Sequence, residues 1–240
     1  MRFQRLLAVV VFCIVTLPHV AIAQSAERFG VGAKFSTLGF GIEGATRVTD
    51  RSAIRGSFNF FDNDRTFDKD GIDYDGVVKL RSFQVTYDQY LVGSLHISPG
   101  LLLYNGNRAE TNASVPAGQS FTLGDVPFFS NTTDPVRGTG MLDFRNVAPM
   151  LLVGIGNLLP QSGGRFGFNV EAGVAFQGAP DIRINLAGTA CAINPTTACT
   201  NAATDPIVQA AIEREQSKLI DETEWLKYYP IFSVGFLWKF

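Results

Sequence analysis

The stretch FSVGFLWKF, residues 232–240, decides the expected fold of the chain. Every second side chain in it is large and apolar: Phe232, Val234, Phe236, Trp238 and Phe240. The side chains between them are smaller or more polar, as at Ser233, Gly235 and Lys239. Because successive side chains of a β-strand point to opposite faces, a strand here has one aromatic-rich face and one wetter face. The pattern indicates lipid on one side and a polar lumen on the other.

A final strand that ends in Phe, with apolar residues at every second position before it, resembles the assembly signal of bacterial outer-membrane β-barrels. The resemblance implies that the barrel assembly machinery recognises these five apolar residues during biogenesis. It also implies that the protein lies in the cell outer membrane of a Gram-negative bacterium, in contact with membrane lipid and lipopolysaccharide.

The first 23 residues have the features of a cleaved export signal. Arg2 and Arg5 precede an apolar stretch, and the small-residue site Ala21-Ile22-Ala23 follows it. The apolar stretch is shorter than the roughly 20 residues that a membrane-spanning helix needs. A retained N-terminal anchor is the alternative, and the Ala-x-Ala site argues against it. We therefore expect a signal peptide at residues 1–23 and a single barrel domain at residues 24–240.

The composition restricts the class of protein further. The chain is 46% hydrophobic, with 24 Gly and 20 Phe, yet no apolar run after the signal is long enough for a transmembrane helix. Only helices and closed barrels satisfy every backbone polar group in lipid, so a closed barrel or a secreted soluble β-protein remains. The net charge of −2 gives no indication of nucleic-acid binding.

The mature chain contains eight segments of alternating hydrophobicity, each close to the roughly ten residues with which a tilted strand crosses a bilayer. They are residues 29–35, 38–48, 53–61, 77–91, 95–105, 144–157, 166–177 and 228–240. The connections alternate between short and long, which is typical of short periplasmic turns and longer outer loops. A soluble sandwich would instead bury one face against a second sheet. We expect an all-β fold, an eight-stranded antiparallel up-and-down transmembrane β-barrel.

Charged residues of both signs fall on the inward faces of these segments. The predicted lumen network consists of Lys34, Glu43, Arg55, Asp88 and Glu171. Eight strands enclose a space just wide enough for side chains to fill, as in small OmpA/OmpX-type barrels. Since buried charges must be paired, we expect salt bridges that plug the lumen. A narrow, porin-like path for ions or small solutes is the alternative.

The second outer connection, residues 62–76, is rich in carboxylates. Four of them surround a turn glycine in DKDGIDYDG, namely Asp68, Asp70, Asp73 and Asp75. Dense carboxylates of this kind can bind Ca²⁺. The helix-loop-helix calcium pattern does not fit, because Thr66 would take its first ligand position and Val77 its twelfth. A solvated acidic loop is the alternative, and no other cofactor is expected.

The last outer connection contains two further features. Cys191 and Cys199 are the cysteines left after signal cleavage, and an even pair in an oxidising compartment predicts a disulfide. Further on, Asp205 and Pro206 suit the N-cap and first position of a helix, and apolar residues follow at helical spacing. We expect a short amphipathic helix in this loop.

His96-Ile97-Ser98 resembles the His-x-Ser arrangement of some small outer-membrane lipases. Alternation places the His96 side chain inward near a short turn, whereas such a lipase works at the outer leaflet facing lipid. The sequence shows no acid placed to orient the imidazole, as a triad needs. We therefore expect no enzymatic activity, and a lipid-modifying enzyme is the least favoured alternative.

With the strands placed, a wider resemblance covers nearly the whole mature chain. The stretches that carry it are GAKFSTLGFGIEG (32–44), DGIDYDGVVKLRS (70–82), DFRNVAPMLLVGIGN (143–157), EAGVAFQGAP (171–180) and YYPIFSVGFLWKF (228–240). They resemble a family of Gram-negative outer-membrane proteins known mainly as predicted barrels. The resemblance implies fold and location, and it transfers no catalytic residue. We expect a role in envelope structure or surface interaction, with a partner that the sequence does not identify.

Overall fold

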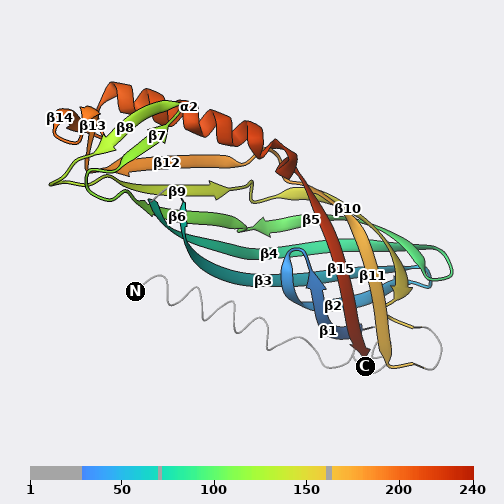
Figure 1. The fold of residues 1–240 in the computed structure, drawn as a ribbon. Coiled ribbons are helices and arrows are strands. Elements are labelled where there is room, and N and C mark those ends of the chain that lie inside the picture. Colours follow the sequence, from blue (N-terminus) through green and yellow to red (C-terminus); the bar gives the residue numbers. More distant parts are fainter. Residues whose placement is uncertain (1–28, 70–71, 161–163) are drawn as a thin grey trace, which may run out of the picture.

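The computed structural model describes residues 29–69, 72–160 and 164–240 (Figure 1). In these residues the chain forms antiparallel strands, one α-helix, α2 (Pro206–Glu222), and a short 3₁₀ helix, η2 (Glu224–Lys227). The predicted all-β class is confirmed. The expected signal peptide at residues 1–23 and Asp70 lie outside the described residues. No helix within the described ranges has the length and apolarity to span a membrane.

Eight strands each pair with two neighbours, and all of these pairings are antiparallel. They are β1 (Phe29–Ser36), β2 (Gly39–Thr49), β3 (Ser52–Lys69), β4 (Ile72–Val92), β5 (Leu95–Asn105), β10 (Ala148–Asn157), β11 (Phe166–Phe176) and β15 (Tyr228–Lys239). The order β4-β3-β2-β1-β15-β11-β10-β5 returns to its start because β5 also pairs with β4. We call this circuit the ring. Each of its strands overlaps one of the eight predicted segments, but β3 and β4 extend well beyond the predicted 53–61 and 77–91, and β10 begins at Ala148 rather than at residue 144.

The predicted alternation between two faces is present in the ring strands. In β15, the Phe236 side chain is 52% exposed, whereas Leu237 is 1% exposed. The predicted apolar face follows the same rule: Phe232, Trp238 and Phe240 are also exposed, and Val234 is partly exposed. The ring therefore presents large apolar side chains outward and buries the alternate residues inside.

The ring is extended at one end by further strands that the sequence did not indicate (Figure 1). The first half of β4 pairs with β6 (Arg108–Ser114), followed by β9 (Arg137–Asp143) and β12 (Asp181–Ala187). A second sheet has the order β14-β13-β8-β7. Its strands are β7 (Ser120–Leu123), β8 (Val126–Ser130), β13 (Thr189–Asn194) and β14 (Thr197–Asn201). We call these strands, with α2, the extension.

The prediction of loops in this region was wrong. Residues 62–69 and 72–76 are paired strand residues of the β3–β4 hairpin, in which β3 runs to Lys69 and β4 begins at Ile72. The two longer connections, residues 106–143 and 178–227, contain the remaining strands of the extension. Several of these strands lack alternating apolar residues: β6 reads RAETNAS and β14 reads TACTN. Their hydrophobic pattern is therefore too weak to predict a strand.

Two local predictions for the last connection are confirmed. The Asp205 side chain accepts hydrogen bonds from the backbone N–H groups of Ile207 (2.9 Å) and Val208 (3.1 Å), and α2 begins at Pro206. A disulfide joins Cys191 to Cys199, which face each other across β13 and β14.

An apolar cluster fills the ring at the end nearer the extension. It includes Leu38, Leu102, Met150, Leu152 and Ile231, all buried. Alternation in the predicted segment 38–48 puts Leu38 on the outward face with Phe40 and Ile42; those two are exposed, but for Leu38 the prediction is wrong. Leu38 lies in the β1–β2 turn rather than in a strand, and its backbone N–H bonds to Ser36 Oγ at 3.2 Å. The strand rule of alternation does not apply to a turn residue, and the side chain folds into the interior.

We predict that Leu152→Ala lowers the free energy of unfolding by about 2–5 kcal/mol, because it leaves a void in the buried cluster. Leu151→Ala is the matched control, since the neighbouring Leu151 side chain points outward from the same strand. Denaturant titration of the refolded protein measures both values. Equal losses would show that the cluster is not packed as described.

Candidate functional site

The centre of the ring is occupied by a buried guanidinium that contacts three carboxylates. Arg55 of β3 bonds through Nη1 to Glu171 Oε2 (2.8 Å) and Glu43 Oε2 (3.3 Å). Its Nη2 atom bonds to Asp88 Oδ1 (2.9 Å) and to Glu171 Oε1. All four side chains are at most 2% exposed. The Arg55–Glu171 pair is bidentate, which is the strongest and most directional form of this interaction.

The strand register explains how these residues meet. Glu43 of β2 is opposite Ser57, and Asp88 of β4 is opposite Ala53. Glu43 and Asp88 therefore lie on the two strands that flank β3, each two residues along from the position directly opposite Arg55. At this spacing both carboxylates point inward and are within reach of the long Arg55 side chain. Glu171 belongs to β11, which is not a neighbour of β3, and it reaches Arg55 through the interior. Alternation predicts that Glu171 points inward, but it does not reveal this partner.

Two serine hydroxyl groups and a histidine also contact these carboxylates. Together with Arg55 and the carboxylates they form what we call the charged layer. Ser233 Oγ donates to Glu171 Oε2 at 3.1 Å, and Ser57 Oγ donates to Glu43 Oε2 at 3.2 Å. His96 Nε2 lies 3.1 Å from Glu171 Oε1, and its Nδ1 lies 3.2 Å from Ser94 O. The sequence reasoning found no acid beside His96, and the structure supplies one from a distant strand.

The His96-x-Ser98 pattern does not form a nucleophile and base pair. Ser98 Oγ is buried and has no hydrogen-bond partner among the described residues. The imidazole contacts Glu171, whose carboxylate is already bound to Arg55. A catalytic serine needs a hydrogen bond to its base, and this geometry lacks it.

Lys34 is the remaining member of the predicted network, and the structure places it inside the ring without direct pairing. Its side chain is 1% exposed, and its Nζ has no hydrogen-bond partner in the described part of the chain. The polar atoms of Gln84 and Asn169 are also buried without partners there. The interior thus contains one tightly paired cluster and several weakly satisfied polar groups.

Apolar layers lie on both sides of the charged layer. Along β15 the inward residues include Ile231, Ser233 and Leu237, so the interior changes from apolar to polar and back to apolar. At the end with the short turns, Leu237 packs with Leu158, Leu159 and two alanines. The connection after β10 is held there by a hydrogen bond from Lys239 Nζ to Pro160 O (2.9 Å) and another from Arg47 to Leu159 O.

The predicted acidic site is spread over a hairpin rather than gathered in a loop. Asp68 is opposite Asp73, and Asp75 Oδ1 accepts a hydrogen bond from Thr66 Oγ1 at 2.8 Å. Within the described ranges, no three His, Cys, Asp or Glu side chains form a group suited to a metal ion. Asp70, the fourth predicted ligand, lies outside those ranges, so the described residues give the calcium prediction no support.

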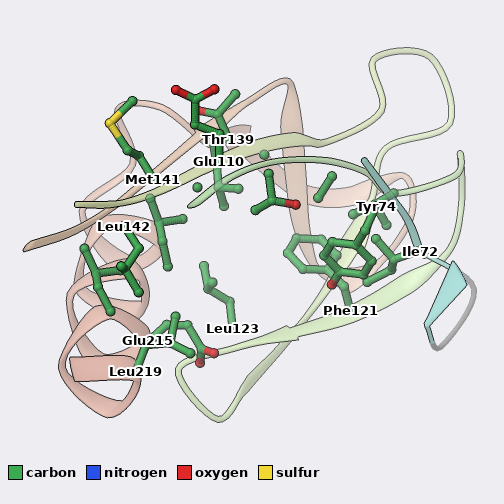
Figure 2. Close-up of a pocket in the computed structure, with 18 of the residues that line it drawn as sticks. Ile72, Tyr74, Glu110, Phe121, Leu123, Thr139, Met141, Leu142, Glu215 and Leu219 are labelled. Carbon is green, nitrogen blue, oxygen red and sulfur yellow. The ribbon is translucent and has the colours of Figure 1, made fainter. Parts of the chain in front are cut away.

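A second candidate site is a cavity of about 350 Å³ in the extension, which the sequence did not indicate (Figure 2). It lies between the sheet β6-β9-β12, strand β7 and helix α2. Figure 2 shows side chains from these elements around the space, among them Leu142, Leu123 and Leu219. Its lining comes from residues far apart in the sequence. Several of the strands that carry these residues also lack alternating apolar side chains, so their hydrophobic pattern does not predict them.

No protein-family model matches the chain, and no curated protein matches it significantly by sequence. Its fold is similar to that of CarO. The CarO structure from Acinetobacter baumannii has a TM-score of 0.53 and 20% identity, over 88% of this chain and 97% of CarO. The structure of CarO2 from the same organism has a TM-score of 0.55 and 17% identity, over 89% and 98%. The predicted relationship to OmpA/OmpX-type barrels, or to a family of predicted barrels, stays a prediction.

We predict that Arg55→Ala lowers the free energy of unfolding by about 3–5 kcal/mol, because it leaves three buried carboxylates without their cation. Arg81→Ala is the control: Arg81 pairs with Asp62 at 2.6 Å, but both side chains are about half exposed, so we expect a loss of only about 0–1 kcal/mol. Denaturant titration at neutral pH checks both. A loss at Arg55 no larger than the loss at Arg81 would contradict the assigned role.

Proposed function

We propose that this protein is an integral outer-membrane protein whose ring is an eight-stranded transmembrane β-barrel with a closed lumen, and whose extension carries a surface-interaction function. The observation that carries the proposal is the buried Arg55 cluster between two apolar layers. CarO from Acinetobacter baumannii has a similar fold, over 88% of this chain.

The outer surface of the ring supports a membrane location. Exposed large apolar side chains occur on all eight ring strands, including Phe35, Phe58, Leu101, Val153 and Phe236. Exposed apolar area this extensive is uncommon on soluble monomers and indicates contact with lipid or a partner. An outward apolar band with aromatic residues is the pattern of outer-membrane barrels. We propose contacts with membrane lipid and lipopolysaccharide, and recognition of the last strand by the assembly machinery.

The distribution of connections supports one orientation. Residues 50–51, 93–94, 158–160 and 164–165 lie at the end opposite the extension. Short turns face the periplasm and long connections face outward in such barrels. We propose that the extension stands on the cell surface.

The energy needed to open the interior of the ring supports a closed lumen. A solute passing the charged layer would have to separate Arg55 from Glu171 and displace apolar side chains on both sides. Breaking a buried ion pair costs several kcal/mol because each charge loses its partner in a low-dielectric interior. The Nζ of Lys34 and the polar atoms of Gln84, which have no hydrogen-bond partner among the described residues, favour the second candidate, a narrow channel. We propose no enzymatic activity, since His96 and Ser98 form no catalytic pair.

For the lumen, we predict that planar bilayers containing the refolded protein show no discrete conductance steps. Heat modifiability on gels verifies that the barrels are folded. Glu43→Gln and Arg55→Ala are tested in parallel, because a pore lined by these residues would change its conductance or ion preference. Steady openings of the unaltered protein that change in these variants would establish the channel and overturn the closed lumen.

For the orientation, we predict that an epitope inserted between Pro195 and Thr196 binds antibody on intact cells. This site is in the exposed β13–β14 turn of the extension. An epitope after Gly93, in the short β4–β5 turn, is the matched control and should bind only after the outer membrane is permeabilised. The reverse pattern would contradict the proposed orientation.

A further inference from the structure

The cavity in the extension exists because small residues form the middle of its floor. On the strands β6 and β9 these residues are Ala109, Thr111, Ala113, Gly138 and Gly140. The register aligns them in rows across the sheet: Thr111 is opposite Gly140, which is opposite Ile184 of β12. The floor therefore has large side chains at its β12 edge and small side chains at its centre.

The opposite wall is held away from this floor by contacts of α2 with the apolar core of the extension and with Gly124. In the first half of α2, Val208, Ala211 and Ile212 are buried in the apolar core of the extension. Glu215 then accepts a hydrogen bond from the backbone N–H of Gly124 at 3.0 Å. Leu219, one turn further along, faces the cavity and stays partly exposed (Figure 2). Helix α2 therefore lies opposite the floor, and its side chains leave the space between them open.

The charged groups in the lining already have partners within the protein. Glu110 accepts hydrogen bonds from Lys79 Nζ (3.0 Å) and Arg108 Nε (2.7 Å), and these bonds hold the pKa of its carboxyl below the usual value. Glu215 is bonded to Gly124. A charged ligand would therefore enter an apolar space whose described lining offers no free counter-charge, which is unfavourable.

One polar atom in the lining lacks a partner. The Oγ1 atom of Thr111 is buried and has no hydrogen-bond partner among the residues that the structure describes. Buried polar atoms are nearly always satisfied in native proteins. Because this atom has almost no accessible surface, a ligand in the apolar space gains a hydrogen bond from it only when the Thr111 side chain turns its hydroxyl toward the cavity.

We propose that this cavity binds a small, uncharged, largely apolar molecule with one hydrogen-bonding group, which pairs with Thr111 Oγ1. A volume of about 350 Å³ lies within the usual range for small-molecule sites, which are mostly apolar with a few fixed polar groups. The inference rests on the proposed surface function and specifies its ligand chemistry.

Indole is a suitable probe because it is apolar and uncharged and has a single N–H donor. We would incorporate the refolded mature protein, with isotope-labelled Ile methyl groups, into lipid nanodiscs and titrate it with indole. Ile182 and Ile184 line the cavity, whereas Ile42 and Ile155 face outward from the ring. We expect saturable shifts of the first pair, and only weak, non-saturating changes of the second pair from partitioning into lipid.

Four variants test the site. Ala109→Leu fills the floor, Leu219→Trp fills the space from the opposite wall, and each should abolish saturable binding. Thr111→Val keeps the shape, removes the hydroxyl and should weaken binding by about two- to tenfold. Asn112→Leu is the control, because Asn112 lies on the opposite face of β6 and is exposed; its affinity should equal that of the unaltered protein.

Charged analogues of the same ring test the ligand class. Indole-3-acetate and tryptamine should bind roughly tenfold more weakly or worse, because the cavity offers no free counter-charge. Unshifted Ile182 and Ile184 up to the solubility limit of indole, or binding that survives both filling variants, would overturn the site. Equally tight binding of tryptamine would overturn the uncharged class. The outward-facing methyl signals and the conductance assay report on the barrel independently, so the two proposals can fail separately.

Discussion

The pairing of one buried guanidinium with three carboxylates is the constraint on which the interior of the ring depends. Each ion loses several kcal/mol of hydration on burial, and only close, well-oriented partners offset that loss. Arg55, Glu43, Asp88 and Glu171 meet this condition because all four point inward from strands whose pairing is fixed. A slip of one residue in β2 or β4 would turn a carboxylate outward and leave the guanidinium undercompensated. The cluster therefore selects the register as well as occupying the interior of the ring.

The β3–β4 hairpin connects this interior to the extension. The part of the hairpin nearer the short turns belongs to the ring and carries Arg55 and Asp88. The first half of β4 pairs with β6, which is the first strand of the extension. Helix α2 packs on the extension and leads through η2 into β15, whose inward residues line the ring. A stable ring is thus the scaffold that holds the small-residue floor of the cavity opposite α2.

Much of the ring could be predicted from the sequence, because each strand there alternates between an outward apolar face and an inward face. That rule placed Arg55 and its partners inside. It failed at Leu38, which belongs to a turn. It also could not pair Glu171 with Arg55, because contacts across a ring are not encoded in the alternation of any single strand.

The strands of the extension were missed for a different reason, although its helix and its disulfide were predicted. Strands β6 and β14 contain few apolar residues, so their pairing depends on neighbouring strands rather than on their own pattern. The cavity arises from the absence of bulk at Ala109, Ala113, Gly138 and Gly140, which single-sequence patterns of large apolar residues do not register. Thr111 became noticeable only when the structure placed its hydroxyl in an apolar lining.

The most direct test of the closed lumen is thiol labelling at Ser57, which is buried beside Glu43. A Ser57→Cys variant of the mature chain has one free thiol, because Cys191 and Cys199 are joined. The account predicts that a cationic methanethiosulfonate reagent leaves this thiol unmodified in folded barrels from either side of the membrane, while Asn112→Cys on the exposed face of the extension reacts readily. Rapid modification of the Ser57→Cys thiol in the folded protein would show an aqueous path through the charged layer and contradict the account.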